Sequence, residues 1–252
     1  MKTRVKVTIA ALSSVLLLGS MNFAAEAAPS KSVKTVAAKP QAVNKAEQLE
    51  KEEIARINKL LEENPDDSYM VYVSNELTKG KGLETFAMGN ISPEYTTYED
   101  YWIKASTLKE PIPKQPDGLP EGYSFAEGKI IGPNSGNYQK EMKAEAKKLG
   151  KQIYSKKINW TTTNLITLKY KNGDNYIQLQ STRLDAKDNK QKGYTYLTAE
   201  EMKKKNPKIS AEFISTTLSW IENDKAFAIT TNPGNPSTKD DLIKLAKTAV
   251  KK

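Results

Sequence analysis

The chain has 252 residues, and its 39 Lys and Arg outnumber its 30 Asp and Glu, for a formal net charge of +9 at pH 7. It contains neither cysteine nor histidine. These absences exclude disulfides, thiolate nucleophiles, Ser-His-Asp triads and metal sites built on Cys or His. An enzyme would have to act through carboxylates, Lys or Tyr, so we expect a non-enzymatic protein without a cofactor.

Residues 1–27 have the features of a secretory signal peptide. A basic start precedes the apolar stretch IAALSSVLLLG at 9–19, and small residues surround a predicted cleavage before Ala28. The apolar stretch is shorter than the roughly 20 residues of a transmembrane helix, and an uncleaved N-terminal anchor stays open as the alternative. We expect a secreted or cell-envelope-associated protein with no membrane span after cleavage. Secretion without cysteine is typical of a bacterial exoprotein.

The N-terminal half divides into a linker and a folded region. Residues 28–45 are rich in Lys and poor in large apolar side chains, which predicts a flexible linker. Apolar residues at helical spacing predict a helix over 46–64, ended by Asn64-Pro65. Strands are expected at 68–74 and at 99–106, and together these elements make an N-terminal region over 46–110.

Three prolines, Pro111, Pro113 and Pro116, predict an extended connector and the best domain boundary in the chain. Beyond it, over 117–252, strands dominate. Two hairpins are expected, at 164–182 with a turn at Asn172-Gly173, and at 214–231 with a turn over 222–225. Further strands are expected at 122–132 and 152–159, and helices at 138–150, 198–206 and 237–251.

Local signals define the ends of these helices. Gly150 stands where a glycine stop belongs. Thr198 and Glu201 are spaced as a capping box, and Ser237 is the expected N-cap of the last helix. Hairpins and amphipathic helices together predict an α+β fold: one twisted antiparallel sheet covered on one face by helices.

The stretch LPEGY at 119–123 resembles the start of a wall-sorting signal, but Gly122 stands where Thr is required and the stretch lies mid-chain. With ITLKYKNGDNYIQLQ, LSWIENDKAFAIT and STKDDLIKLAKTAV, it instead resembles the Gram-positive extracytoplasmic family designated domain of unknown function 4367, over about residues 117–252. The resemblance implies an extracytoplasmic location, an α+β fold and a sensing or partner-binding role. The family offers no catalytic residues to carry over.

Few residues stand out as a site. Trp160, between Asn159 and three threonines, is expected to be exposed and is the candidate ligand-binding residue, although most strand aromatics pack in cores. Trp220 is expected in the core beside Leu218. Oxygen ligands at Asp185, Asp188 and Asn189 are too few for a calcium site, so we expect no metal.

Other charged groups have simpler explanations. Asp66-Asp67 and Asp240-Asp241 are expected as turn and cap residues. Lysines at 143–151 and 202–208 could contact anionic wall polymers or lipid head groups, but a solvated helix face explains them as well. Nucleic-acid binding would require interleaved aromatics, and secretion argues against it.

Three functions remain open. The leading hypothesis is a secreted or envelope-associated binding or regulatory module with an unknown protein or envelope partner. The second is a carrier of a lipid or other apolar ligand in a cavity between sheet and helices. The third is a carboxylate-based enzyme acting on wall polysaccharide.

Overall fold

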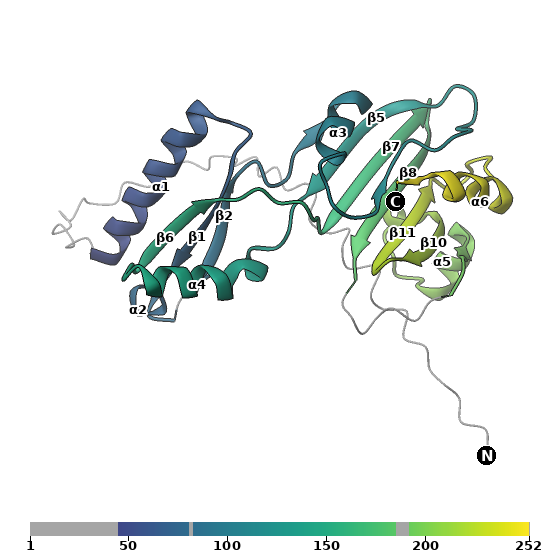
Figure 1. Ribbon diagram of the computed structural model, residues 1–252. Coiled ribbons are helices and arrows are strands. Elements are labelled where there is room, and N and C mark those ends of the chain that lie inside the picture. The colour runs from purple at the N-terminus through teal and green to yellow at the C-terminus, as the bar shows by residue number, and fades with distance from the viewer. Residues whose placement is uncertain (1–44, 81–82, 185–191, 252) are drawn as a thin grey trace, which may run out of the picture.

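The computed structural model of the chain describes residues 45–80, 83–184 and 192–251. The predicted signal peptide, the linker up to residue 44 and the oxygen ligands Asp185, Asp188 and Asn189 lie outside the described residues. Within these ranges the strands form three antiparallel sheets, and helices pack on them (Figure 1). The predicted α+β class is therefore confirmed, but the expected single sheet is wrong.

The small sheet has the strand order β2-β1-β6 and a helix on each face (Figure 1). Its elements are α1 (Lys45–Glu63), β1 (Ser68–Val73), β2 (Thr85–Gly89), α4 (Gln139–Lys148) and β6 (Ile153–Lys157). Every residue of β1 is buried because its alternate side chains enter two cores. Val71 packs with Ile57 of α1, whereas Met70 shares the larger core with Met142 of α4.

The connector at 111–116 does not separate two domains. β6 lies after it in the sequence, yet β6 pairs with β1, which lies before it. Within the connector, β4 (Ile112–Pro113) pairs with β12 (Val250–Lys251) in a two-stranded sheet. The division at 46–110 and 117–252 is therefore corrected: the small sheet is built from 45–89 and 139–157.

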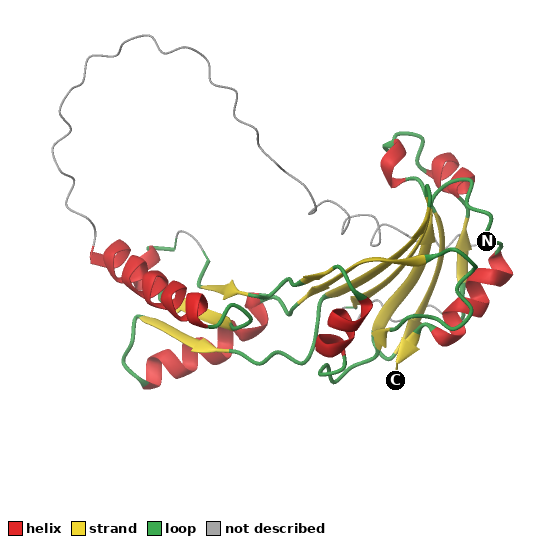
Figure 2. Cartoon of the chain, turned by 90° about the horizontal axis from the view of Figure 1, so that it is seen from above, coloured by secondary structure: helices red, strands yellow, loops and turns green. Residues whose placement is uncertain are grey.

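The large sheet has the order β3-β5-β7-β8-β11-β10-β9. Its strands are β3 (Glu94–Tyr95), β5 (Ser124–Ile131), β7 (Leu165–Asn172), β8 (Asn175–Arg183), β9 (Thr195–Leu197), β10 (Thr216–Glu222) and β11 (Lys225–Thr231). Seen from above, the large and the small group of strands lie end to end (Figure 2).

One face of the large sheet carries the main core. Leu168, Leu179 and Phe227 point into it, together with residues of α3 (Tyr98–Ala105) and α6 (Lys239–Thr248). The opposite face presents half-buried polar side chains such as Thr167 and Gln180, which are direct neighbours across β7 and β8. The alternation of apolar and polar residues therefore matches a sheet with one covered face. The remaining helices are α2 (Asn75–Thr78) and α5 (Ala199–Lys205).

Both predicted hairpins are present. In the first, Asn172 still pairs with Asn175, so the turn consists of Gly173 and Asp174, one residue later than expected. Gly173 has φ +57°, which favours glycine. In the second, Glu222 pairs with Lys225, and Asn223 and Asp224 both have positive φ, as a type I′ turn requires.

The predicted strand at 99–106 is wrong, because these residues form helix α3. Thr97 caps the helix by accepting a hydrogen bond from the Asp100 backbone N–H at 3.2 Å. Tyr101 and Ala105 are four residues apart and are both fully buried. In a strand, these two residues would share a face with Ile103, but Ile103 is 69% exposed. The aromatic and β-branched content favoured a strand; capping and the burial period favour the helix.

Two other helix ends follow the capping rules. The predicted box of Thr198 and Glu201 begins α5 and is confirmed. The last helix begins one residue later than expected, because Thr238 and not Ser237 is its cap, in a box with Asp241. The hydroxyl of Thr238, two residues before the pair Asp240-Asp241, was therefore a better indicator of the N-cap than Ser237.

The LPEGY stretch attaches the start of β5 to two turns. Gly122 has φ +83°, and a Cβ there would lie 2.7 Å from the Asn172 side-chain nitrogen. That nitrogen donates to the Glu121 carbonyl at 3.2 Å, and the Tyr123 hydroxyl accepts from Asn235 at 2.9 Å. The stretch therefore has a structural role in closing the first hairpin and the loop before α6.

Replacing Glu53 by Gln should lower stability at neutral pH by less than about 1 kcal/mol and flatten the acid side of the stability profile. Glu53 accepts from Arg56 at 2.7 Å and from Ser155 of β6, which holds α1 on the sheet. The Arg56 hydrogen bond lowers the pKa of Glu53 below 4.5. Its contribution is therefore present above that pH and is lost as pH falls through the lowered pKa. Urea unfolding between pH 3 and 7 tests this, with exposed Glu62→Gln as the control; equal profiles for the two variants would contradict it.

Candidate binding site

The predicted ligand-binding residue Trp160 is buried, with only 5% of its surface exposed. The expectation that it is exposed is therefore wrong. Its indole N–H lies 3.4 Å from Ser68 Oγ, and the Lys104 ammonium lies 3.8 Å from its ring centre. It nevertheless borders a hollow of about 270 Å³ between the two main sheets. Trp220 stacks on Phe227 in the core, which confirms that expectation.

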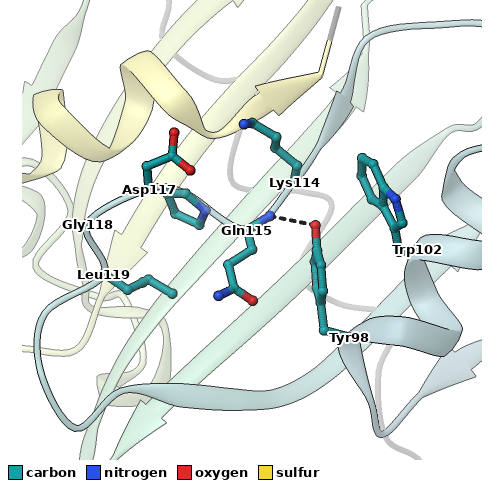
Figure 3. Close-up of a pocket in the computed structure, with 8 residues that line it drawn as sticks. Tyr98, Trp102, Lys114, Gln115, Asp117, Gly118 and Leu119 are labelled. Atoms are coloured by element: carbon teal, nitrogen blue, oxygen red, sulfur yellow. Dashed lines mark hydrogen bonds between the residues drawn. The ribbon is translucent and has the colours of Figure 1, made fainter.

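A larger surface groove, of about 660 Å³, lies between helix α3 and the segment at 114–119 (Figure 3). Eight residues line it: Tyr98, Trp102, Lys114, Gln115, Pro116, Asp117, Gly118 and Leu119. One wall is thus aromatic and the other is polar, with Leu119 at the far end. The groove is open to solvent, and its volume lies within the range of known ligand sites.

The aromatic wall consists of Tyr98 and Trp102, one helical turn apart on α3. Their ring centres are 5.9 Å apart and their planes differ by 20°. The Lys251 ammonium lies 5.1 Å from the Trp102 ring, at a distance where a cation is attracted to an aromatic face. Burial raises the pKa of Tyr98, so its phenol stays neutral over the physiological range.

The polar wall is an extended segment held by its backbone. The Gln115 N–H donates to the Tyr98 hydroxyl at 3.0 Å (Figure 3), the Lys114 N–H to the Ala249 carbonyl at 2.8 Å, and the Asp117 N–H to Thr248 at 3.0 Å. Figure 3 shows the Gln115 side chain between Tyr98 and Leu119. Because these hydrogen bonds hold the backbone of the segment in place, its side chains project from a fixed position.

The side-chain polar groups of Lys114, Gln115 and Asp117 have no hydrogen-bond or ion-pair partner among the described residues. They supply an ammonium, an amide and a carboxylate, so the groove offers both donors and acceptors. A ligand with many hydroxyl groups can use all three, and the Tyr98 and Trp102 rings border the same groove. The groove therefore combines hydrogen-bonding groups with aromatic rings.

Sequence reasoning missed this groove for two reasons. It placed Trp102 on a strand, where Tyr98 would not stack on it, and it treated 111–116 as a connector between domains. The four-residue spacing of Tyr98 and Trp102 was the available signal, because side chains at i and i+4 meet on a helix. Nothing local indicated that β12 would hold the connector against α3.

Some of the charged candidates have structural partners. Asp241 caps α6, and Asp67 forms an ion pair with Lys157 at 2.6 Å. Among the predicted lysine clusters, Lys143 pairs with Glu84 at 3.6 Å, and Lys203, Lys204 and Lys205 are exposed on α5. Within the described ranges, no group of three or more acidic side chains could hold a metal ion.

The space between the large sheet and α6 is filled by side chains. Leu242 and Leu245 of the helix pack with Leu218, Phe227 and Ile229 of the sheet, and all five are at most 2% exposed. The two hollows described above lie elsewhere, and polar residues contribute most of their lining. The packing at α6 thus leaves no cavity there for the ligand of the apolar-carrier hypothesis.

Comparison of the chain with protein-family models, curated proteins and solved structures gave no match. The similarity to the domain of unknown function 4367 therefore stays a resemblance carried by the four short motifs. No helix within the described residues has the length and apolar character needed to cross a membrane.

Proposed function

We propose that this protein is a secreted or envelope-associated, non-enzymatic binding module whose ligand is an oligosaccharide stretch of an envelope polymer. The observation that carries the proposal is the groove between α3 and 114–119, which is lined by the Tyr98–Trp102 stack and by the Lys114, Gln115 and Asp117 side chains. The signal-peptide pattern at 1–27 supports an extracytoplasmic setting in which such polymers are the nearest ligands.

The lining also favours a chain with some negative charge. Lys114 borders the groove and Lys251 lies against Trp102, whereas Asp117 supplies the one carboxylate of the lining. Without the predicted signal peptide at 1–27 the chain still carries a net charge of +7, so an anionic polymer would be attracted to it at low salt. Hydroxyl recognition in the groove and weak attraction over the surface would act together.

Trp102→Ala should weaken glycan binding by at least about tenfold, because a central aromatic contact contributes about 2 kcal/mol or more to such interfaces. The measurement is isothermal titration calorimetry of the mature chain with soluble wall-glycan fragments. Ile103→Ala is the matched control, since Ile103 is the next residue on α3 and is 69% exposed. Equal affinities of the two variants would contradict the assignment of the groove.

The same titrations separate binding from catalysis. After incubation, the fragments should be recovered at their original length. If the fragments are shortened, and if Asp117→Asn abolishes this cleavage, the hypothesis of a carboxylate-based enzyme replaces that of a binding module. Apolar material released from the purified protein by organic extraction would instead favour the carrier.

A further inference from the structure

The second hollow lies where the two main sheets meet. Its walls come from the turn at 66–68 that enters β1, from Lys104 and Thr107 at the end of α3, and from the segment 157–161 that links β6 to β7. Its volume is about 270 Å³, which suits a small molecule. Ligand sites occur preferentially at such junctions, because two units supply different groups to one cavity.

The floor of this hollow is rigid. The Trp160 ring packs against Gly132, where an added Cβ would lie 3.4 Å from the indole. The indole N–H is directed to Ser68 Oγ at 3.4 Å, and Ser68 itself donates to the Asn90 carbonyl at 2.9 Å. The ring is therefore held in place, and the Lys104 ammonium lies 3.8 Å from its centre.

Lys104 carries an ammonium group without an acceptor. No carboxylate or other acceptor within the described residues forms a hydrogen bond with its Nζ, which lies over the Trp160 ring. Burial lowers the pKa of Lys104, and the nearby Asp66 carboxylate raises it again in part. A partly desolvated ammonium with three N–H donors favours an anionic oxygen from a ligand.

The opposite charge is present in the same hollow. Asp66 is exposed and, among the described residues, accepts one long hydrogen bond of 3.5 Å, from Asn90, whereas Asp67 is neutralised by Lys157 at 2.6 Å. Apart from the Asp67–Lys157 pair, the lining therefore holds one cation, Lys104, and one anion, Asp66, that can bind a ligand. Asn159 and Thr161 add an amide and a hydroxyl to the lining.

We infer that this hollow, the Lys104–Trp160 pocket, binds a small zwitterion, a free amino acid or the end of a short peptide. The ligand carboxylate would accept from Lys104 and the ligand ammonium would donate to Asp66. A simple anion would satisfy Lys104 but leave Asp66 beside it unpaired, and a simple amine would do the reverse. The pocket shares no residue with the α3 groove, so the inference does not depend on the proposed glycan site.

The test is isothermal titration calorimetry of the full mature chain with L-alanine, D-alanine and alanylalanine, and with acetate and ethylamine as half-ligands. We expect at least one zwitterion to bind with a Kd of about 1 mM or tighter, and both half-ligands to bind at least tenfold more weakly. Lys104→Gln and Asp66→Asn should each weaken zwitterion binding at least tenfold. Lys104→Arg, which keeps the charge, should retain most of it.

One control locates the site. Lys109→Gln removes an exposed lysine just after the same helix and should bind the zwitterion as the parent chain does. Urea midpoints of all variants show whether each is folded. The inference is overturned if no probe binds, if acetate binds as tightly as alanine, or if Asp66→Asn leaves alanine binding unchanged.

Discussion

Glu110→Ala should lower the free energy of unfolding by about 3–5 kcal/mol, because it leaves a buried ammonium without its partner. Glu110 Oε1 accepts from Lys225 Nζ at 2.7 Å, and from the Thr163 N–H and hydroxyl at 2.7 and 2.6 Å. The Lys225 and Glu110 side chains are 4% and 11% exposed. Urea unfolding of the parent and variant, with unchanged slope, measures the loss.

This ion pair attaches the segment that follows α3 to the large sheet. Glu110 lies just before β4, Thr163 just before β7, and Lys225 at the start of β11. The matched control is Glu94→Ala, since Glu94 pairs with Lys129 at a similar 2.6 Å but is 71% exposed; its loss should stay below about 1 kcal/mol. Replacing both partners, as Glu110→Leu with Lys225→Met, should recover most of the stability. Equal losses in Glu110→Ala and Glu94→Ala would contradict the prediction.

The Glu110→Ala variant should also regain stability at alkaline pH. Burial lowers the pKa of Lys225 from its ordinary 10.5, and the hydrogen bond that Lys225 donates to Glu110 partly opposes this. Between the lowered folded pKa and 10.5, the unfolded chain binds more protons than the folded one, so stability rises with pH in that window. Without Glu110 the folded pKa falls further, and the window widens. Unfolding curves from pH 7 to 10.5 test this; a constant difference between variant and parent would contradict it.

Gly89→Ala should cost about 3 kcal/mol or more, through both backbone strain and overlap. Gly89 ends β2 with φ +88°, and a Cβ there would lie 2.3 Å from the Asp67 carbonyl oxygen and 2.7 Å from a Leu61 methyl. The Asp67 carbonyl cannot move freely, because it accepts from the Asn90 N–H at 2.9 Å. The substitution would therefore push β2 away from β1 and from α1.

Gly150→Ala separates the two causes. Gly150 also has a positive φ, +64°, but nothing lies within 4 Å of a Cβ at that position. Its replacement should lower the free energy of unfolding by about 1 kcal/mol, which is the contribution of backbone strain without overlap. Chemical denaturation of the two variants gives the comparison. If Gly89→Ala costs no more than Gly150→Ala, the close approach of β2 to the turn at 66–68 does not constrain the fold.

Local sequence patterns predicted those elements whose cause is local. The NG and ND turns, the Thr198 box, the glycine stop at Gly150 and the apolar stripe of α1 all act within a few residues, and each lies at or next to its expected place. Residues 99–106 show the limit of composition, because a helix cap at Thr97 outweighed a content typical of strands.

Tertiary pairing decided what local patterns could not. The prolines at 111–116 make that segment extended, as expected, but only its pairing with β12 places it against α3 and so creates the groove. Likewise, β1 and β6 lie about 80 residues apart in the chain, so their pairing depends on which faces α1 and α4 can bury. The burial of Trp160 follows from that junction of sheets. By itself, the sequence determined the class of fold, the absence of Cys and His chemistry and most turns and helix ends, because these depend on composition and near neighbours. The sheet partners and both candidate sites depend on contacts between distant segments, which only the folded chain brings together.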